Sequence, residues 1–312
     1  MKKLLYTIAL LGLAGLSAQA QQLPQLSFHM FNQQLVNPAF VGSNGSLGFQ
    51  LTGRQQWTGI EGAPNTYVAA VDAPIGKRST KPGLAFGLMG YQDEIGVSRI
   101  NHAQLQLAYR IFFKNSALAF GIQGSATRFI DDYTKLNVAD PNDPEANQRI
   151  TSDILPNTGF GVYYYNSNFY LGVSLAQFSE YSTENLGGYE QARHIFTQGG
   201  FNLQVSDDFK LRPSFMAKLN GSENFESPFN AEINLSGIYK DRILLGVGHR
   251  INEAVIAMMK LHLTDEFYIG YAYDFNTSVV GANANGSHEV LIGYRVNLNS
   301  KAIASPRFIT YF

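Results

Sequence analysis

The sequence predicts an all-β outer-membrane protein: a 14-stranded antiparallel transmembrane β-barrel preceded by an N-terminal segment that is not a strand. Three observations support this fold class. The chain opens with an export signal and has no later apolar run long enough for a membrane-spanning helix. Charged residues are scarce while aromatic residues are abundant. Apolar side chains also recur at every second position in segment after segment.

The first residues have the features of a signal for the general secretory pathway. Two lysines follow the initiating methionine and precede an apolar run (4–16), and Ser17-Ala18-Gln19-Ala20 places small residues where signal peptidase cleaves. The run is shorter than the roughly 20 residues that a spanning helix needs. We therefore expect a signal peptide at 1–20 and a mature chain that begins at position 21 or 22.

Composition favours a lipid-facing protein. Charged residues make up 15% of the chain, whereas a soluble domain averages roughly 25%. The net charge of -1 gives no reason to expect a nucleic acid as partner. Because the chain has no cysteine, a lipoprotein anchor, disulfides and cysteine-ligated metals are excluded. Composition alone leaves a secreted soluble β-sandwich open.

Alternation is the strongest of the three observations. Within 102–111, Leu105, Leu107 and Tyr109 fall on one face and are expected to point outward, while Gln104 and Arg110 fall on the other. Similar segments predict fourteen strands, at 46–57, 66–73, 83–91, 97–112, 116–128, 157–165, 169–177, 193–205, 209–219, 230–239, 243–250, 254–263, 267–274 and 287–297. An even number is what a bacterial barrel with both termini in the periplasm requires.

The connections between these strands alternate in length. One set is mostly short, as at Lys114-Asn115 and Lys240-Asp241-Arg242, and these are expected to be periplasmic turns. The other set includes the long polar segments 129–156, 178–192, 220–229 and 275–286, which are expected to be surface loops. We therefore place the barrel at 46–299, followed by a C-terminal tail at 300–312.

The segment 21–45 does not alternate and contains an Asn-Pro turn at Asn37-Pro38. Linkers rarely carry so many Phe, Met and Leu residues, so we expect an ordered piece. It either plugs the lumen or faces periplasmic components, and a short linker is the simpler alternative.

Several residues are candidates for partner binding. Trp57, with Arg54 and Glu61, lies at a junction between a strand and a surface loop. Two interpretations stay open: an aromatic anchor at the membrane interface, or a loop folded into the mouth where Arg54 and Glu61 organise a partner site. The inward-facing ionisable residues are expected to be mostly structural, with a minority that bind an exported signal; they are Arg110, Glu232, Lys260, His262, Glu289 and Arg295.

Two motifs resemble the PorP/SprF membrane proteins of the type IX secretion system. One is Asn37-Pro38-Ala39-Phe40-Val41-Gly42-Ser43, and the other runs from Arg54 through Trp57 to Pro64. Matches recur in order along the mature chain, at Asp93-Glu94-Ile95-Gly96, Gly270-Tyr271-Ala272-Tyr273-Asp274, Ser287-His288-Glu289 and Ser305-Pro306-Arg307-Phe308. The extension 309–312 departs from the family's usual ending.

The resemblance implies an outer-membrane component of type IX secretion, the export route of gliding and gingival Bacteroidota. It would act as acceptor or surface anchor for a secreted protein, an adhesin or its C-terminal signal. Other partners it implies are the translocon, periplasmic peptidoglycan-associated components and outer-membrane lipid. On the residues themselves, a passive porin-like channel remains the alternative. A hydrolase has less support, because the six histidines are scattered and suggest no catalytic, metal or cofactor site.

Overall fold

The computed structural model describes residues 23–76, 83–136, 148–183, 189–191, 193–220, 230–278, 281 and 284–296. Signal-peptide positions 1–20 and the tail 300–312 lie outside them. The wall strands are β1 (Leu47–Gln55), β2 (Asn65–Ile75), β3 (Gly83–Ile95), β4 (Ser98–Phe112), β5 (Ser116–Asp132), β7 (Leu155–Asn166), β8 (Phe169–Leu175), β11 (His194–Phe201) continued by β12 (Leu203–Gln204), β13 (Phe209–Asn220), β14 (Asn230–Tyr239), β15 (Ile243–Arg250), β16 (Ala254–His262), β17 (Phe267–Asn276) and β18 (Ser287–Val296).

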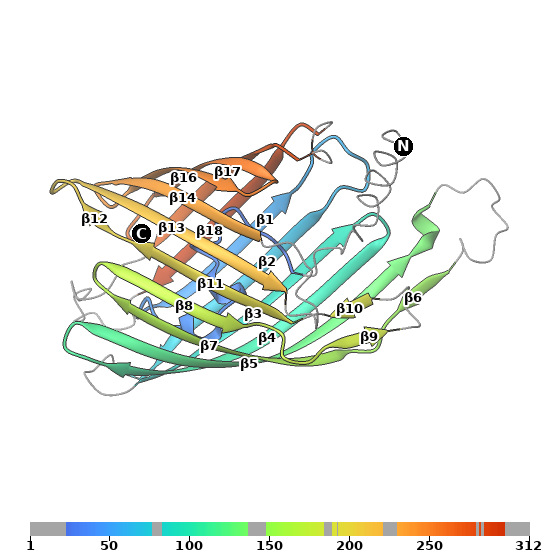
Figure 1. Ribbon diagram of the computed structural model, residues 1–312, viewed down its shortest axis with the longest axis horizontal. Helices are drawn as coiled ribbons and strands as arrows, with labels where there is room; N and C mark the ends of the chain where they lie inside the picture. The colour runs from blue at the N-terminus through green and yellow to red at the C-terminus, as the bar shows by residue number, and fades with distance from the viewer. Residues whose placement is uncertain are drawn as a thin grey trace, which may run out of the picture.

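These strands form one closed antiparallel barrel of 14 strands (Figure 1), as predicted. Each strand pairs with its neighbour in the chain, and the cylinder closes where β1 pairs with β18, from Leu47 opposite Val296 to Gln55 opposite His288. Closure matters because an unpaired strand edge in hydrocarbon would leave backbone groups without partners. Within the described residues, no helix is long and apolar enough to cross a bilayer.

Alternation sorts the side chains as expected. On β4, Leu105, Leu107 and Tyr109 are exposed on the outer wall, whereas Gln104 and Arg110 are buried inside the barrel. Exposed apolar residues recur on the outer faces of the other wall strands. The outer face is therefore suited to lipid and the inner face is polar.

The two ends of the barrel differ as the connections predicted. Tight turns close one end, such as Tyr239–Arg242, where Lys240 and Asp241 both have positive φ, as in a type I′ hairpin. We call this the turn end and the opposite one the loop end. At the loop end the structure adds short strands within the predicted loops: β6 (Arg149–Thr151) pairs with β5, and β9 (Tyr181–Thr183) pairs with β10 (Tyr189–Gln191).

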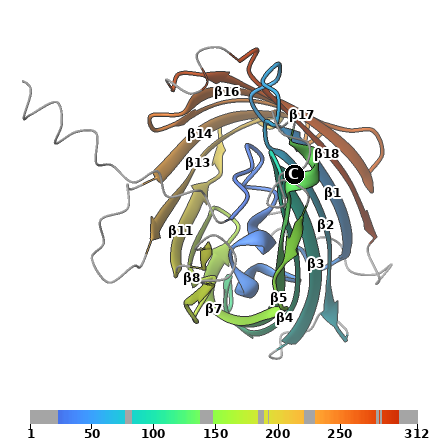
Figure 2. The same cartoon turned by 90° about the vertical axis from the view of Figure 1, so that its right-hand side faces the viewer.

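Residues 23–46, here called the lumen segment, fill the interior of the barrel (Figure 2). Every residue from 26 to 43 is buried, and the segment contains two single-turn 3₁₀ helices, η1 (Gln33–Leu35) and η2 (Pro38–Phe40). Backbone inside a barrel still needs hydrogen-bond partners, and inward glutamines supply several. Gln104 and Gln106, for example, donate from Nε2 to the Gln34 carbonyl at 3.2 and 2.8 Å.

Leu105 at the middle of β4 tests the assignment of the outer face. Leu105→Arg should lower the unfolding free energy by roughly 2–4 kcal/mol, because the charge would sit near the middle of the bilayer. Phe113→Arg, at a similarly exposed position beside a turn, is the control and should cost about 0–1 kcal/mol. Urea unfolding in liposomes measures both. Equal costs at the two positions would contradict the membrane placement.

Candidate functional site: the lumen segment and the rim of the barrel

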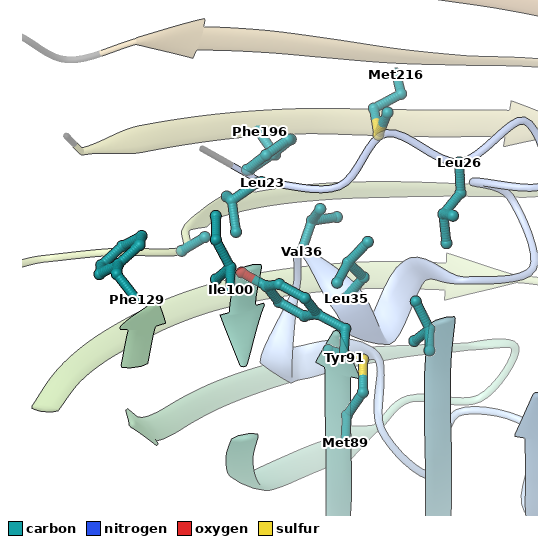
Figure 3. Close-up of a cluster of buried hydrophobic side chains, with 12 residues drawn as sticks. Leu23, Leu26, Leu35, Val36, Met89, Tyr91, Ile100, Phe129, Phe196 and Met216 are labelled. Atoms are coloured by element: carbon teal, nitrogen blue, oxygen red, sulfur yellow. The ribbon is translucent and has the colours of Figure 1, made fainter. Parts of the chain in front are cut away.

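Apolar side chains anchor the first part of the lumen segment. Leu23, Leu26, Leu35 and Val36 pack against inward side chains of several wall strands (Figure 3). The wall residues in this cluster include Met89 and Tyr91 of β3, Ile100 of β4, Phe129 of β5, Phe196 of β11 and Met216 of β13. The lumen is therefore partly a hydrophobic core, unlike the water-filled interior of an open porin.

The Asn-Pro turn fits against glycines of the wall. Asn37 begins η2, its Oδ1 accepts the Ala39 N–H at 2.9 Å, and its Nδ2 donates to the Val162 carbonyl at 3.2 Å. Opposite it, a β-carbon at Gly121 or Gly161 would overlap the 37–39 turn. Glycines here allow the turn to approach the wall backbone directly.

A buried network of ion pairs lies near the loop end. We call it the ion cluster; its members are Arg54 of β1, Glu232 of β14, Arg250 of β15, Asp274 of β17 and Glu289 of β18. Arg54 contacts Asp274 at 2.8 Å and Glu289 at 3.3 Å. Arg250 contacts Glu232 at 2.7 Å and Asp274 at 3.1 Å. All of these side chains are at most 2% exposed, so water screens the network little.

The lumen segment completes this cluster. The two guanidinium groups face the three carboxylates of the cluster, and Arg250 also lies 3.3 Å from Glu253. Donors from the segment offset part of this excess of carboxylates. The backbone N–H groups of Ser27 and Phe28 donate to the two oxygens of Glu289 at 2.6 and 2.9 Å. The Ser27 hydroxyl donates to Asp274 at 2.6 Å and accepts from Arg54 at 2.7 Å. The segment thus supplies hydrogen-bond donors to a carboxylate that it also covers from water.

A second contact holds the segment near the turn end. The Gly42 N–H donates to Asp72 of β2 at 2.7 Å, and Asp72 also lies 3.7 Å from Nη1 of Arg295 on β18. Gly42 has a φ of +69°, and a β-carbon there would lie 2.5 Å from Nη2 of Arg110. Glycine is required at this point for both its backbone conformation and its lack of a side chain.

The rim at the loop end is built around the connection 56–64. The Trp57 N–H donates to Ser287 Oγ at 3.1 Å and the Thr58 N–H donates to the Gly286 carbonyl at 2.8 Å. On the other side, the Gly96 N–H donates to the Gly62 carbonyl at 2.8 Å. The connection is therefore held by both neighbouring loops. Trp57 also has a φ of +48°, which is uncommon for a bulky residue.

The structure brings only some of the predicted residues together. Arg54 and Glu289 meet in the ion cluster, while Arg110 and Arg295 lie around Gly42 and Asp72. Asn37 and Pro38 lie against Gly121 and Gly161 of the wall strands. Trp57 is half-exposed and Glu61 is exposed on the rim. Among the described residues, the side-chain contacts of Arg54 are to Ser27, Asp274 and Glu289 rather than to Glu61.

Sequence reasoning missed several residues that build the site. Arg250 and Asp274 are inward-facing charges at strand ends, and alternation could have found them. Asp72 could have been found in the same way. Ser27 carried no signal, because it lies outside any periodic segment. In the described parts of the chain, no group of three or more His, Asp or Glu side chains could hold a metal ion.

Residues 18–294 match the sequence model of a family described as "Type IX secretion system membrane protein PorP/SprF". The match covers most of the chain, the lumen segment and the wall included. The chain belongs to the PorP/SprF family. It is therefore an outer-membrane barrel of type IX secretion. The family consists of membrane components of a secretion system and is not a class of enzymes.

Other comparisons add less. No curated protein matches the chain. Solved barrels similar to it include a deletion mutant of the monoaromatic hydrocarbon channel TodX (9% identity, covering 84% of this chain and 93% of that one, TM-score 0.49). A second is the Ralstonia pickettii toluene transporter TbuX (9% identity, covering 83% of this chain and 91% of that one, TM-score 0.47). A third is Omp33 of Acinetobacter baumannii (7% identity, covering 81% of this chain and 100% of that one, TM-score 0.44). No property of these proteins is transferred to this PorP/SprF chain.

Arg54 is expected to stabilise the PorP/SprF fold through the ion cluster. Arg54→Ala should lower the unfolding free energy by about 3–5 kcal/mol, because it leaves Asp274 and Glu289 buried with fewer partners. Arg242→Ala, which breaks an exposed pair with Asp265 at 2.8 Å, should have little effect. Urea unfolding in detergent measures both variants. Equal, small losses would mean that the ion cluster does not stabilise the barrel.

Gly121 tests the packing of the Asn-Pro turn. Gly121→Ala should expose the lumen segment to chymotrypsin, because the new methyl group overlaps backbone atoms of Pro38 and Ala39. The segment contains Phe28, Phe31 and Phe40 as cleavage sites. Gly124→Ala on the same strand is the matched control, since its β-carbon would meet nothing within 4 Å. Protection of the segment in both variants would contradict the packing described above.

Proposed function

We propose that this barrel is an outer-membrane acceptor or surface anchor for a secreted protein, either an adhesin or its C-terminal signal, and that it catalyses no reaction. The single observation that carries the proposal is the filled lumen. The chain's own segment lies inside the barrel, buried from residue 26 to 43, with contacts from Gln25 near the loop end to Gly42 near the turn end. A partner therefore has the rims of the barrel left to bind.

The loop-end rim has the properties of a docking surface. The connection 56–64 is tied to the loop before β18 and to the turn between β3 and β4, so it would lose little conformational entropy on binding. It presents Trp57, and tryptophan is enriched among residues that dominate binding energy. Glu61 adds an exposed charge beside it. We assign direct contact with the secreted partner to Trp57 and Glu61.

The remaining candidates are assigned an indirect role. Arg54 and Glu289 hold the start of the lumen segment, while Arg110 and Arg295 surround Gly42 near its end. Asn37 and Pro38 shape the turn between them. We propose that these residues position the segment and the rim. Components of the translocon or of the periplasm would meet the turn end, where exposed ion pairs such as Lys210–Asp241 and Arg242–Asp265 lie.

Substitutions on the rim should separate partner binding from barrel stability. Trp57→Ala and Glu61→Gln are expected to reduce the amount of partner retained on the cell surface several-fold, with normal barrel levels in the outer membrane. Trp57→Phe is the control for an aromatic anchor, because it keeps an aromatic ring at the interface. Affinity purification from native outer membranes identifies the partner first. Unchanged retention in both variants, or in a strain lacking the gene, would overturn the acceptor role.

Conductance distinguishes the acceptor from the alternative, a passive porin-like channel. The polar inner face favours a channel, but the lumen segment occupies that space. The purified protein should therefore be silent in planar bilayers. Gly121→Ala, which displaces the Asn-Pro turn, should show transient openings, whereas Gly124→Ala should remain silent. A stable open pore of the unaltered protein would favour the channel and contradict the acceptor role proposed here.

A further inference from the structure

We infer that the lumen segment enters the barrel at its loop-end mouth, so that Leu23, the first described residue, lies at the end of the barrel that faces the cell surface. An even number of wall strands would by itself keep both ends of the barrel at the turn end, in the periplasm. The lumen segment adds one more pass through the interior. This inference rests on the path of the segment and on the outer-membrane location, and it is independent of the proposed acceptor role.

The first described residues have contacts at the loop ends of the wall strands. Gln25 donates from Nε2 to Oδ1 of Asn230, the first residue of β14, at 3.0 Å. Leu23 belongs to an apolar cluster whose wall members include Ile100, Phe129 and Phe196 (Figure 3). Each of these three lies within a few residues of the loop end of its strand. The segment therefore starts at the mouth that the long connections surround.

Later contacts of the segment reach the turn end. Ser27 reaches Arg54 and Asp274, which lie within two residues of the loop ends of β1 and β17. The Phe31 carbonyl accepts a hydrogen bond at 3.2 Å from Gln50, which lies in the half of β1 nearer the turn end. Gly42 reaches Asp72, which lies close to the turn end of β2.

At its end the segment runs directly into the wall. Ser46 is followed by Leu47, the first residue of β1, which starts at the turn end. The segment thus crosses the lumen once, from the loop end to the turn end, and β1 returns beside it. The path between these ends is not straight, because Leu35 and Val36 pack in the same cluster as Leu23 and Leu26. Its two ends nevertheless differ in level: Gln25 lies at the loop end and Ser46 at the turn end.

The position of Leu23 at the mouth also has a physical basis. The ion cluster lies at this end, and the backbone N–H groups of Ser27 and Phe28 each donate a hydrogen bond to one oxygen of Glu289 there. Moving the start of the segment away from the loop end would break the hydrogen bonds of Ser27 and Phe28 to Glu289 and of Ser27 to Arg54 and Asp274. The start of the segment is therefore held at the loop end by the same contacts that stabilise the barrel.

Single-cysteine labelling tests this arrangement, because the natural chain has no cysteine. A Gly-Ser-Cys-Gly-Ser insertion between Gln22 and Leu23 is treated, in intact cells, with a maleimide that cannot cross the outer membrane. Asp153→Cys, exposed within the loop-end connection between β6 and β7, is the surface control; Asp265→Cys, exposed in a turn, is the periplasmic control. The insertion should be labelled as strongly as the surface control, and the periplasmic control only after permeabilisation.

Labelling of the insertion only after permeabilisation, together with Asp265→Cys, would overturn the inference. If the insertion lowers barrel yield, a second experiment on the detergent-extracted protein replaces it. Gln25→Cys combined with Asn230→Cys should be joined by a short bis-maleimide, whereas Gln25→Cys combined with Asp208→Cys, at the turn end, should not. Cross-linking of the second pair instead of the first would overturn the inference equally.

Discussion

The structure depends on one constraint: backbone N–H and C=O groups in hydrocarbon must all be paired within the protein. A β-sheet meets that constraint only when its edges are joined, and the pairing of β1 with β18 is the joint. Closing 14 strands creates an interior wider than inward side chains alone fill. The lumen segment occupies that space. Closure thus explains why a piece of chain is needed inside, whereas contact with lipid explains the apolar outer wall.

The ion cluster shows how the wall and the lumen segment depend on each other. Charges that face the lumen avoid lipid, but once the segment covers them they lose water as well, and each must then find a partner in the protein. Arg54 and Arg250 come from the wall, whereas the backbone N–H groups that donate to Glu289 belong to Ser27 and Phe28 of the lumen segment. Neither part of the site is electrostatically complete alone. This coupling explains why a segment without strand structure is buried along almost its whole length.

The sequence predicts the wall strands far better than the path of the lumen segment inside them. A strand repeats every two residues, so the alternation of Leu105 and Leu107 with Gln104 and Gln106 determines which side chains reach the lumen. The path of the lumen segment has no such period. Its contact with Glu289 joins residues 262 positions apart, and no local pattern carries that information. The positive φ of Trp57 was equally unpredictable, because only the surrounding loops hold a tryptophan in that conformation.

A filled barrel and a rigid rim also suit the demands of secretion across an outer membrane. In the proposed acceptor role the barrel must hold a partner without creating a leak, and the lumen segment lies where a pore would run. The same filling limits where specificity can arise: buried residues such as Arg54 and Arg110 cannot meet a partner unless the segment moves. The proposed acceptor role therefore assigns recognition to the connections between strands, where sequence can vary without disturbing the hydrogen bonds of the wall.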